Sequence, residues 1–274
     1  MILFLFFLWL YIPFFYKTFA INNKYGGTIR NYYKIIKISP GGYKGFYQLG
    51  ICKFIKENYN LDNFVFSGSS AGSWLSLFMC YKGFDFDIFE KKIINKPAFE
   101  TKTVADLEKT IKNNILENYS NGDFHLDRLF IGSTTSTLGG FFVGNHPDNE
   151  MTISGSPCLK ATIFFGFSSL EDAIDACISS SHVPFICGKI FHFYRNKLSF
   201  DGGFSGNAAF LPDDNADVFH IFPNIFIKKK FGLSRIFSFM TLFSRDKFDF
   251  EKEIKNGYAD AKTNRDYLDS FFYV

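Results

Sequence analysis

Residues 63–78 read NFVFSGSSAGSWLSLF, and this stretch carries the strongest structural signal in the chain. Three consecutive apolar residues, 64–66, predict a short buried strand, and the apolar run that follows predicts a helix over residues 72–81. Between them lies the pattern G-x-S-x-G, formed by Gly68, Ser70 and Gly72. A strand that leads through a tight turn straight into a helix is the repeating unit of a parallel α/β sheet.

A second unit of the same kind lies upstream. Residues 33–38 (YKIIKI) predict a first strand, and Pro40-Gly41-Gly42-Tyr43-Lys44-Gly45 predicts a turn. Residues 45–58 then predict a helix with regularly spaced apolar positions. The alternation indicates an α/β domain, with a central, mostly parallel sheet between helices.

The rest of the chain extends this domain, because no repeat and no low-complexity linker interrupts it. We expect a helix over 104–119, strands over 139–146 and 151–165 around a turn at 147–149, and a helix over 170–180. A strand over 197–200 and a charged C-terminal helix over 248–272 follow. The domain organisation predicted is one domain over residues 35–274.

Composition excludes several classes of function. The 274 residues are 47% hydrophobic, which is enough for one domain with a large core. The net charge is only +3 and the basic residues form no long cluster, so we expect no nucleic-acid partner. The five cysteines are odd in number and lack C-x-x-C spacing, which argues against a disulfide framework and against a zinc site. We expect no metal and no organic cofactor, and no protein partner is evident.

The N-terminal residues are unlike the rest. Residues 1–16 (MILFLFFLWLYIPFFY) contain no charged side chain, and their length falls between that of a signal-peptide core and that of a spanning helix. Residues 1–21 are therefore interpreted as a hydrophobic anchor or a cleaved signal segment, with a buried first element of the domain as a third alternative. Residues 22–34 are interpreted as a tether. The expected location is the membrane or the secretory pathway.

Ser70 is the candidate nucleophile. A tight turn between a strand and a helix lifts the serine hydroxyl out of the sheet, and the start of the helix brings its free N–H groups near the reacting oxygen. The alternative role for Ser70 is that of an ordinary helix cap. Upstream, the backbone N–H groups of Gly41 and Gly42 could form an oxyanion hole, hold a phosphate, or belong to a plain turn. Lys44 either adds positive charge there or lies on the helix surface.

A candidate base lies much further along the chain, in Asp201-Gly202-Gly203. Such a turn alone is typical of any hairpin. The segment before it reads SSSHVPF over residues 179–185, and LSFDGGFSGN covers residues 198–207.

Taken together, these motifs resemble those of the patatin-like phospholipase family. That family pairs a G-G-G-x-[RK]-G element with G-x-S-x-G and a D-G-[GA] turn, in the order found here over roughly residues 35–212. The motif glycines that match are Gly41, Gly42, Gly45, Gly68, Gly72, Gly202 and Gly203. Pro40 departs from the pattern, since it stands where the family has its first glycine, and Lys44 replaces the more usual arginine.

The resemblance implies a three-layer α/β sandwich and a serine lipid acyl hydrolase, of phospholipase A or lipase type, that acts on lipid at a membrane surface. It implies a dyad in which Ser70 attacks the ester carbonyl and Asp201 accepts its proton. Gly41, Gly42 and Lys44 would bind the oxyanion. No histidine and no cofactor is needed.

Three alternatives remain open at this point. One is an acyltransferase that uses the same dyad, and another is an inactive, membrane-tethered binding module. A third is a histidine-triad esterase, for which only His220 follows Asp201, but its apolar neighbours favour a strand residue. In addition, apolar residues at helical spacing over 233–243 follow Lys228-Lys229-Lys230, and such a helix either lies on an anionic membrane or packs on the sheet.

Overall fold

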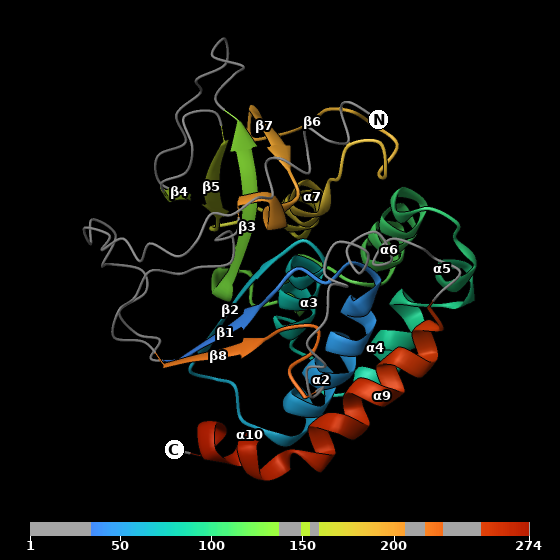
Figure 1. Ribbon diagram of the computed structural model, residues 1–274, viewed down its shortest axis with the longest axis vertical. Coiled ribbons are helices and arrows are strands. Elements are labelled where there is room, and N and C mark those ends of the chain that lie inside the picture. Colours follow the sequence, from blue (N-terminus) through green and yellow to red (C-terminus); the bar gives the residue numbers. More distant parts are fainter. Residues whose placement is uncertain (1–33, 137–148, 154–158, 206–216, 227–247, 274) are drawn as a thin grey trace, which may run out of the picture.

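The computed structural model describes residues 34–136, 149–153, 159–205, 217–226 and 248–273 (Figure 1). The strands are β1 (Lys34–Ile38), β2 (Phe64–Ser69), β3 (Leu129–Ser136), β4 (Glu150–Ile153), β5 (Leu159–Phe164), β6 (His192–Tyr194), β7 (Lys197–Phe200) and β8 (Asp217–Ile221). The helices are α2 (Gly45–Asn58), α3 (Ala71–Met79), α4 (Phe86–Ile93), α5 (Lys96–Glu100), α6 (Val104–Asn118), α7 (Leu170–Ser181), α9 (Phe250–Thr263) and α10 (Arg265–Phe272). Short 3₁₀ turns are η1 (Gly42–Lys44), η2 (Asn121–Asp123), η3 (Leu126–Arg128) and η4 (Gly202–Ser205).

These strands form one mixed sheet in the order β4-β5-β3-β2-β1-β8, with the β6–β7 hairpin added beside β3. Strands β8, β1, β2 and β3 run parallel to one another. Strands β5 and β7 both run antiparallel to β3, and β4 runs antiparallel to β5. The prediction of an α/β fold with a mostly parallel sheet and flanking helices is confirmed.

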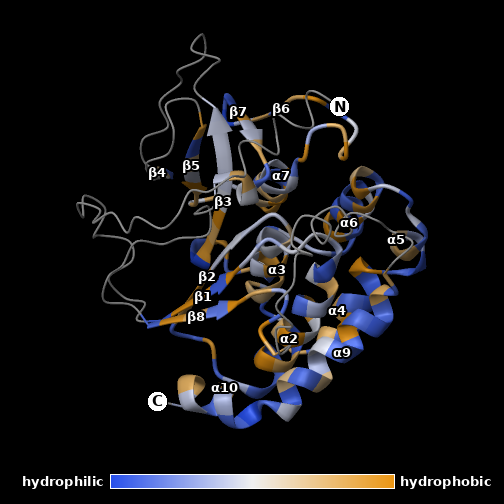
Figure 2. Ribbon diagram, viewed as in Figure 1, coloured by the Kyte–Doolittle hydropathy of each residue, from blue (hydrophilic) through white to orange (hydrophobic). Residues whose placement is uncertain are grey.

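Side chains on the two faces of the sheet belong to different clusters. On one face, Ile36, Phe66 and Ile131 join a large core that continues into α2, α3 and α7. On the other face, Val65 and Ile163 belong to a smaller cluster. Helix α9 packs along α2, and α10 lies at the end of the molecule opposite the β6–β7 hairpin (Figure 1). Hydrophilic residues colour the outer turns of α9 (Figure 2), so its apolar face is turned toward α2.

Most elements lie where their sequence patterns place them. The helix over 45–58 is confirmed as α2, and the strands over 33–38 and 197–200 are confirmed as β1 and β7. The helices over 72–81, 104–119 and 170–180 are confirmed as α3, α6 and α7, within a few residues at their ends. His220 lies on β8, as its apolar neighbours indicate.

The middle of the sheet differs from the prediction. The single strand expected over 151–165 is wrong, because β4 and β5 are two strands that pair antiparallel with Thr152 opposite Thr162. The sequence pattern also missed β3, whose second half is polar. Its threonines are buried and bonded: Thr135 Oγ1 lies 2.8 Å from Thr162 Oγ1, and Thr134 Oγ1 donates to the Asp201 carbonyl oxygen. The second half of this strand is therefore buried without apolar side chains, because hydrogen bonds satisfy its polar groups.

The predicted C-terminal helix is also divided. Residues 248–272 form two helices, α9 and α10, which meet at Asn264 (φ −100°, ψ 30°). The anchor or signal segment, the tether as far as residue 33, the strand over 139–146 and the basic helix over 233–243 lie outside the described residues. Within the described residues, no helix combines the length and the apolar character needed to cross a membrane.

Gly72 shows why the motif requires glycine at this position. A Cβ at Gly72 would lie 2.2 Å from the backbone oxygen of Ile38, so α3 can approach β1 this closely only without a side chain. We expect Gly72→Ala to lower the free energy of unfolding by about 1–3 kcal/mol, because backbone atoms cannot move aside easily. Urea denaturation followed by circular dichroism measures the change.

Gly122 is the matched control for this substitution. A Cβ there would find its nearest neighbour, Ser120 Oγ, 3.7 Å away. Gly122→Ala should leave stability unchanged or raise it slightly, by reducing the freedom of the unfolded chain. Equal losses in both variants would contradict the explanation by close packing.

Candidate active site

Pairing along one edge of β3 brings Ser70 and Asp201 together. Strand β2 runs parallel to β3 and ends with Ser69 opposite Gly132. Strand β7 runs antiparallel to β3 and ends with Phe200 opposite Thr134. The two strands therefore approach each other end to end, and the residue that follows each of them is a predicted catalytic residue.

Ser70 occupies a sharp turn between β2 and α3. Its backbone has φ 55° and ψ −130°, a conformation that residues other than glycine rarely adopt, and the side chain is almost fully buried. The turn is held by Ser180, whose hydroxyl accepts from Ser70 N at 2.8 Å and donates to the Gly132 carbonyl at 2.6 Å. Strained backbone that is fixed by several surrounding bonds is common at functional sites.

Asp201 is also held in place by hydrogen bonds. Its backbone N donates to the His182 carbonyl at 2.7 Å, and its carbonyl accepts from Thr134 Oγ1 at 2.8 Å. In the side chain, Oδ1 accepts from Gly203 N at 2.7 Å, whereas the buried Oδ2 has no partner in hydrogen-bond geometry among the described residues. One carboxylate oxygen is thus held in place by a hydrogen bond, and the other accepts none from the described residues.

Burial raises the pKa of Asp201 to about 6, and interactions with Ser70 and the Gly203 backbone oppose this rise. The Ser70 side chain is therefore close enough to lower the pKa of the carboxyl group, although Oδ2 forms no hydrogen bond with any described residue. Catalytic hydrogen bonds often reach full alignment only when substrate binds. A carboxylate with a raised pKa is a stronger base than an exposed one, as proton abstraction from an alcohol requires.

The pKa of Asp201 leads to a prediction for activity. Below pH 6 the carboxyl group is protonated and cannot accept a proton, so kcat/KM for a soluble ester should fall about tenfold per pH unit there and reach a plateau above pH 6. Initial rates across a series of overlapping buffers measure this profile. A profile without such an acid limb would contradict the role of Asp201 as base.

The glycine turn lies beside the same site. Gly42 has φ 52° and lines a cavity together with Ser70. Gly41 precedes it, and a Cβ there would overlap the Gln48 side chain at 2.2 Å. Gly45 packs against Ala71 at the start of α3, where a Cβ would lie 2.9 Å from the Ala71 methyl group. The turn therefore holds α2 and α3 close together next to Ser70.

Lys44 points elsewhere. Its Nζ donates to Asn224 Oδ1 at 3.1 Å, and its side chain does not line the cavity at Ser70. Gly202 is buried in η4, and a Cβ on Gly203 would lie 2.9 Å from Asp201 Oδ1. A Cβ at Gly68 would lie 2.0 Å from the Gly72 carbonyl. The structure thus places the motif glycines where close approach is needed, but it does not bring the Lys44 amine to the oxyanion position.

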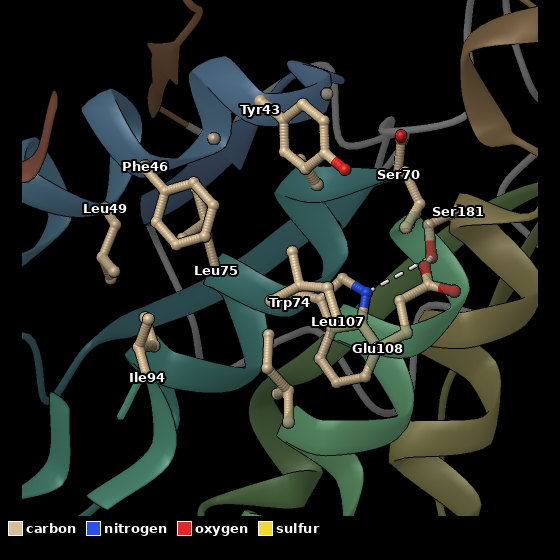
Figure 3. A pocket seen from close by; sticks show the side chains of 15 residues that line it. Tyr43, Phe46, Leu49, Ser70, Trp74, Leu75, Ile94, Leu107, Glu108 and Ser181 are labelled. Carbon is tan, nitrogen blue, oxygen red and sulfur yellow. Dashed lines mark hydrogen bonds between the residues drawn. The ribbon is translucent and has the colours of Figure 1, made fainter. Parts of the chain in front are cut away.

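An apolar cavity of about 120 Å³ opens beside Ser70 (Figure 3). Figure 3 shows Tyr43 and Phe46 on one side, Trp74 and Leu75 from α3 below them, and Leu107 from α6. Ile94, Val104 and Ile111 also line the cavity. A cavity with mostly apolar walls and the Ser70 hydroxyl among its lining residues fits a hydrocarbon chain attached to a reacting carbonyl group.

Glu108 is the main site residue that sequence analysis missed. It is buried on α6, where its Oε1 accepts from the Ser181 hydroxyl, and Trp74 Nε1 donates to that hydroxyl at 3.2 Å (Figure 3). Burial, together with the nearby Asp201 carboxylate, raises the pKa of Glu108 to about 8, and hydrogen bonds from Ser181 and Trp74 oppose this rise. Glu108 is thus neutral at pH 7. The signal was present, since a glutamate occupies the apolar stripe of α6 between Val104 and Ile111.

Among the described residues, no histidine forms a hydrogen bond with Ser70. His220 lies on β8, which is two strands from β2 in the sheet, and its ring shares a 2.6 Å hydrogen bond with Ser39 Oγ. His182 is buried, and its ring lies 5.4 Å from that of His192 rather than against Ser70. Within the described residues, no three histidine, cysteine, aspartate or glutamate side chains gather in a way that could hold a metal ion.

Four of the cysteines lie within the described residues. Cys52, Cys80, Cys177 and Cys187 are buried and form no disulfide with one another. Burial raises the pKa of each thiol above its ordinary value. These thiols are therefore inert, apolar parts of the interior.

The chain was compared with models of known protein families and with curated proteins. No model of a known protein family matches it. No curated protein matches it either. The resemblance to patatin-like phospholipases therefore depends on the motif residues and on the geometry in which they lie.

Proposed function

We propose that this chain is a serine acyl hydrolase of patatin-like, three-layer architecture that cleaves fatty-acyl esters of lipids. The observation that carries the proposal is the end-to-end meeting of β2 and β7 along β3, which sets Ser70 against Asp201. The apolar cavity at Ser70 supports an acyl chain as the part of the substrate that is bound.

The reaction follows from this arrangement. Ser70 Oγ attacks the ester carbonyl carbon while its proton passes to the Asp201 carboxylate, and backbone N–H groups of Gly41 and Gly42 bind the oxyanion. The tetrahedral intermediate expels the alcohol, which takes the proton from Asp201 and leaves an acyl-serine. Water then attacks this ester, again losing its proton to Asp201, and the fatty acid departs as Ser70 regains its proton.

Ser180 and Ser181 support the site in different ways. Ser180 holds the strained turn of Ser70, whereas Ser181 connects Trp74 to the neutral Glu108 on the cavity wall. A neutral acid there keeps a second negative charge away from the forming oxyanion. If both carboxyl groups were ionised, their mutual repulsion would raise the energy of the site.

The experiment that tests the proposal is incubation with a mixed phospholipid and triacylglycerol extract. Fatty acids released by the chain, measured by mass spectrometry, would support acyl hydrolysis, and the depleted lipid would identify the substrate. A fluorophosphonate probe should label the protein, and peptide mapping should place the adduct on Ser70. No label and no fatty acid would contradict the proposal.

An acyltransferase with the same dyad is distinguished in the same assay. Glycerol or a lysolipid added as acceptor would then receive the acyl chain in place of water. New acyl ester without free fatty acid would replace the hydrolase assignment by a transferase assignment.

A further inference from the structure

A cluster of exposed hydrophobic side chains lies next to the active site. Phe185, Ile186, Ile190, Phe191 and Phe193 are each between 38% and 61% exposed, and all five fall within nine positions of the chain. We call these five side chains the apolar rim. Single exposed hydrophobic residues are ordinary, but five exposed hydrophobic side chains within one short segment mark a surface that contacts something apolar.

The chain leads from the active site directly into the apolar rim. Ser180 binds the Ser70 turn, Ser181 lines the cavity, and His182 binds the backbone of Asp201. The rim begins three residues after His182, and its last member lies on β6, in the hairpin whose second strand ends at Phe200, directly before Asp201. A partner that covers the rim would therefore lie beside Ser70 and Asp201.

The loop that presents the rim is closed on itself. The backbone N–H groups of Ile186 and Cys187 both donate to the Val183 carbonyl, at 3.1 and 3.0 Å, and Val183 N donates to Cys187 Sγ. Phe185 has φ 68°, a value that a bulky residue adopts only under constraint, and its ring points outward. The exposure of this ring therefore belongs to a defined turn, and strain of this kind often accompanies function.

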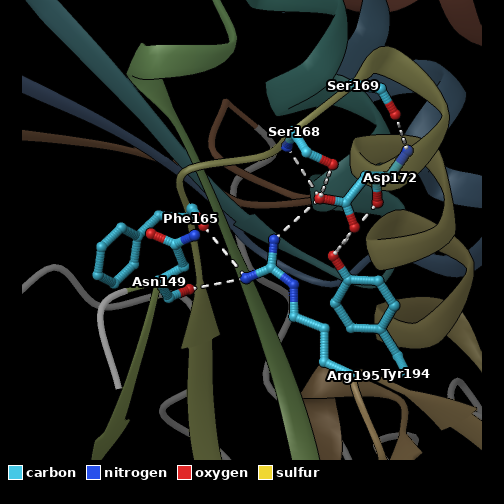
Figure 4. Close-up of polar contacts among 7 residues, drawn as sticks. All are labelled: Asn149, Phe165, Ser168, Ser169, Asp172, Tyr194 and Arg195. Carbon is cyan, nitrogen blue, oxygen red and sulfur yellow. Dashed lines mark hydrogen bonds and ion pairs between the residues drawn. The ribbon is translucent and has the colours of Figure 1, made fainter. Parts of the chain in front are cut away.

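Polar contacts fix the base of the rim to the rest of the fold (Figure 4). Arg195 forms an ion pair with Asp172 on α7 at 3.0 Å and donates to the Asn149 carbonyl at 2.9 Å. Tyr194 donates to the other oxygen of Asp172 at 2.7 Å. The hairpin that carries Phe193 is thus anchored to α7 and to the start of β4, so the rim is presented on a rigid support.

The segment of the chain that carries the rim contains basic but no acidic side chains. Between residues 176 and 200 the sequence contains Lys189, Arg195 and Lys197 and no aspartate or glutamate. Arg195 pairs with Asp172 and Lys197 with Glu150, but exposed Lys189 forms no ion pair with any described residue. Apolar side chains with a free cation among them match a bilayer that has anionic head groups, where the rings enter the acyl boundary and the amine stays at the head groups.

We propose that the apolar rim is a docking surface for an anionic lipid bilayer. This inference rests on the proposed function, since a bilayer at the rim would bring acyl lipids to the cavity at Ser70. Docking is a binding event, so it can be measured without any ester hydrolysis.

The test uses the full chain with a tryptophan placed in the rim, Phe191→Trp. Its matched control is Tyr267→Trp, at an exposed aromatic position on α10, at the opposite end of the molecule (Figure 1). Each spectrum is corrected by subtracting that of the parent chain, which contributes Trp9 and Trp74. Because the reporter lies in the rim, the signal does not depend on how other parts of the chain bind a vesicle.

Both variants are mixed with vesicles of phosphatidylcholine and phosphatidylglycerol whose acyl chains carry bromine. We expect fluorescence at position 191 to be quenched at least about twofold, because interfacial side chains reach the acyl boundary, while position 267 is unaffected. Equal exposure of position 191 to aqueous acrylamide with and without vesicles would overturn the proposal. Shielding that grows with protein concentration without vesicles would also overturn it, and would assign the rim to a second copy of the chain.

A turnover measurement separates this proposal from the proposed function. The double substitution Phe191→Ser with Phe193→Ser should lower hydrolysis of vesicle lipid at least tenfold and leave hydrolysis of a soluble short-chain ester unchanged. Equal losses on both substrates would overturn the docking role. If the parent chain hydrolyses neither substrate, the proposed function fails, and the quenching result still decides whether the rim docks.

Discussion

Replacement of Ser70 by Ala is expected to lower ester hydrolysis by about 10⁴-fold or more, because no other group can form the acyl intermediate. The substitution removes only the Oγ atom. The Ser70 backbone N, which donates to Ser180, remains, so the turn keeps its support. The fold should therefore survive, with an unchanged circular dichroism spectrum. Initial rates on a soluble ester, at a protein concentration high enough to detect residual turnover, measure the loss.

Ser270→Ala is the matched control for this variant. Ser270 lies on α10, where its exposed hydroxyl donates to the Tyr267 carbonyl within its own helix. Full activity is expected in this control. Retention of even a tenth of the parent rate in Ser70→Ala would show that Ser70 is not the nucleophile.

Asp201→Asn is expected to lower turnover by about 10⁴-fold, because an amide cannot accept the proton of Ser70. The Asn side chain keeps an oxygen that can accept from Gly203 N, so the turn after β7 should stay intact. Asp260→Asn is a suitable control, since Asp260 accepts from Tyr47 on the far side of α2 and has no place in the reaction. Near-parental activity in Asp201→Asn would refute the dyad.

Stability provides an independent readout for Asp201. The folded-state pKa of about 6 lies above the ordinary value of 3.8, so the folded state binds the proton more tightly than the unfolded state does. This group therefore stabilises the fold least when ionised, and stability is lost as the pH rises from about 4 through 6. Above pH 6 the Asn variant should be more stable than the parent, by up to about 3 kcal/mol. Urea unfolding at pH 5 and pH 8 measures the difference.

Local pattern was enough to predict half of the sheet. Strands β1 and β2 each contain three apolar residues close together and are followed by glycine turns and apolar helices, so each signal lies within about 25 residues of sequence. The polar half of β3 gives no such signal. Ser133, Thr134 and Thr135 are strand residues because their hydroxyls find partners on β5, β7 and the residue after β7, which lie far away in the sequence.

The candidate site shows the same division. Ser70 and Asp201 could be named from motifs. The apolar stripe of α6 indicates that Glu108 is buried, but its contact with Ser181 could not be predicted, nor could the support that Ser180 gives to Ser70, because both depend on contacts between α6, α7 and the turn after β2. Lys44 shows a further limit of motifs. The motif leaves open whether its amine adds positive charge at the oxyanion hole or lies on the helix surface, because side-chain direction is set by tertiary contacts; in the structure the amine donates to Asn224.

The meeting of β2 and β7 along β3 also affects which changes of sequence such a protein can tolerate. Ser70 and Asp201 each follow a strand that pairs with the segment Gly132–Thr134 of β3. Their separation is therefore set by register along this one strand, which rises about 3.3 Å per residue. Insertions in the surrounding helices or loops change what reaches the cavity but leave this spacing intact. The substrate can therefore diversify without redesign of the reaction, as long as three consecutive residues keep their register.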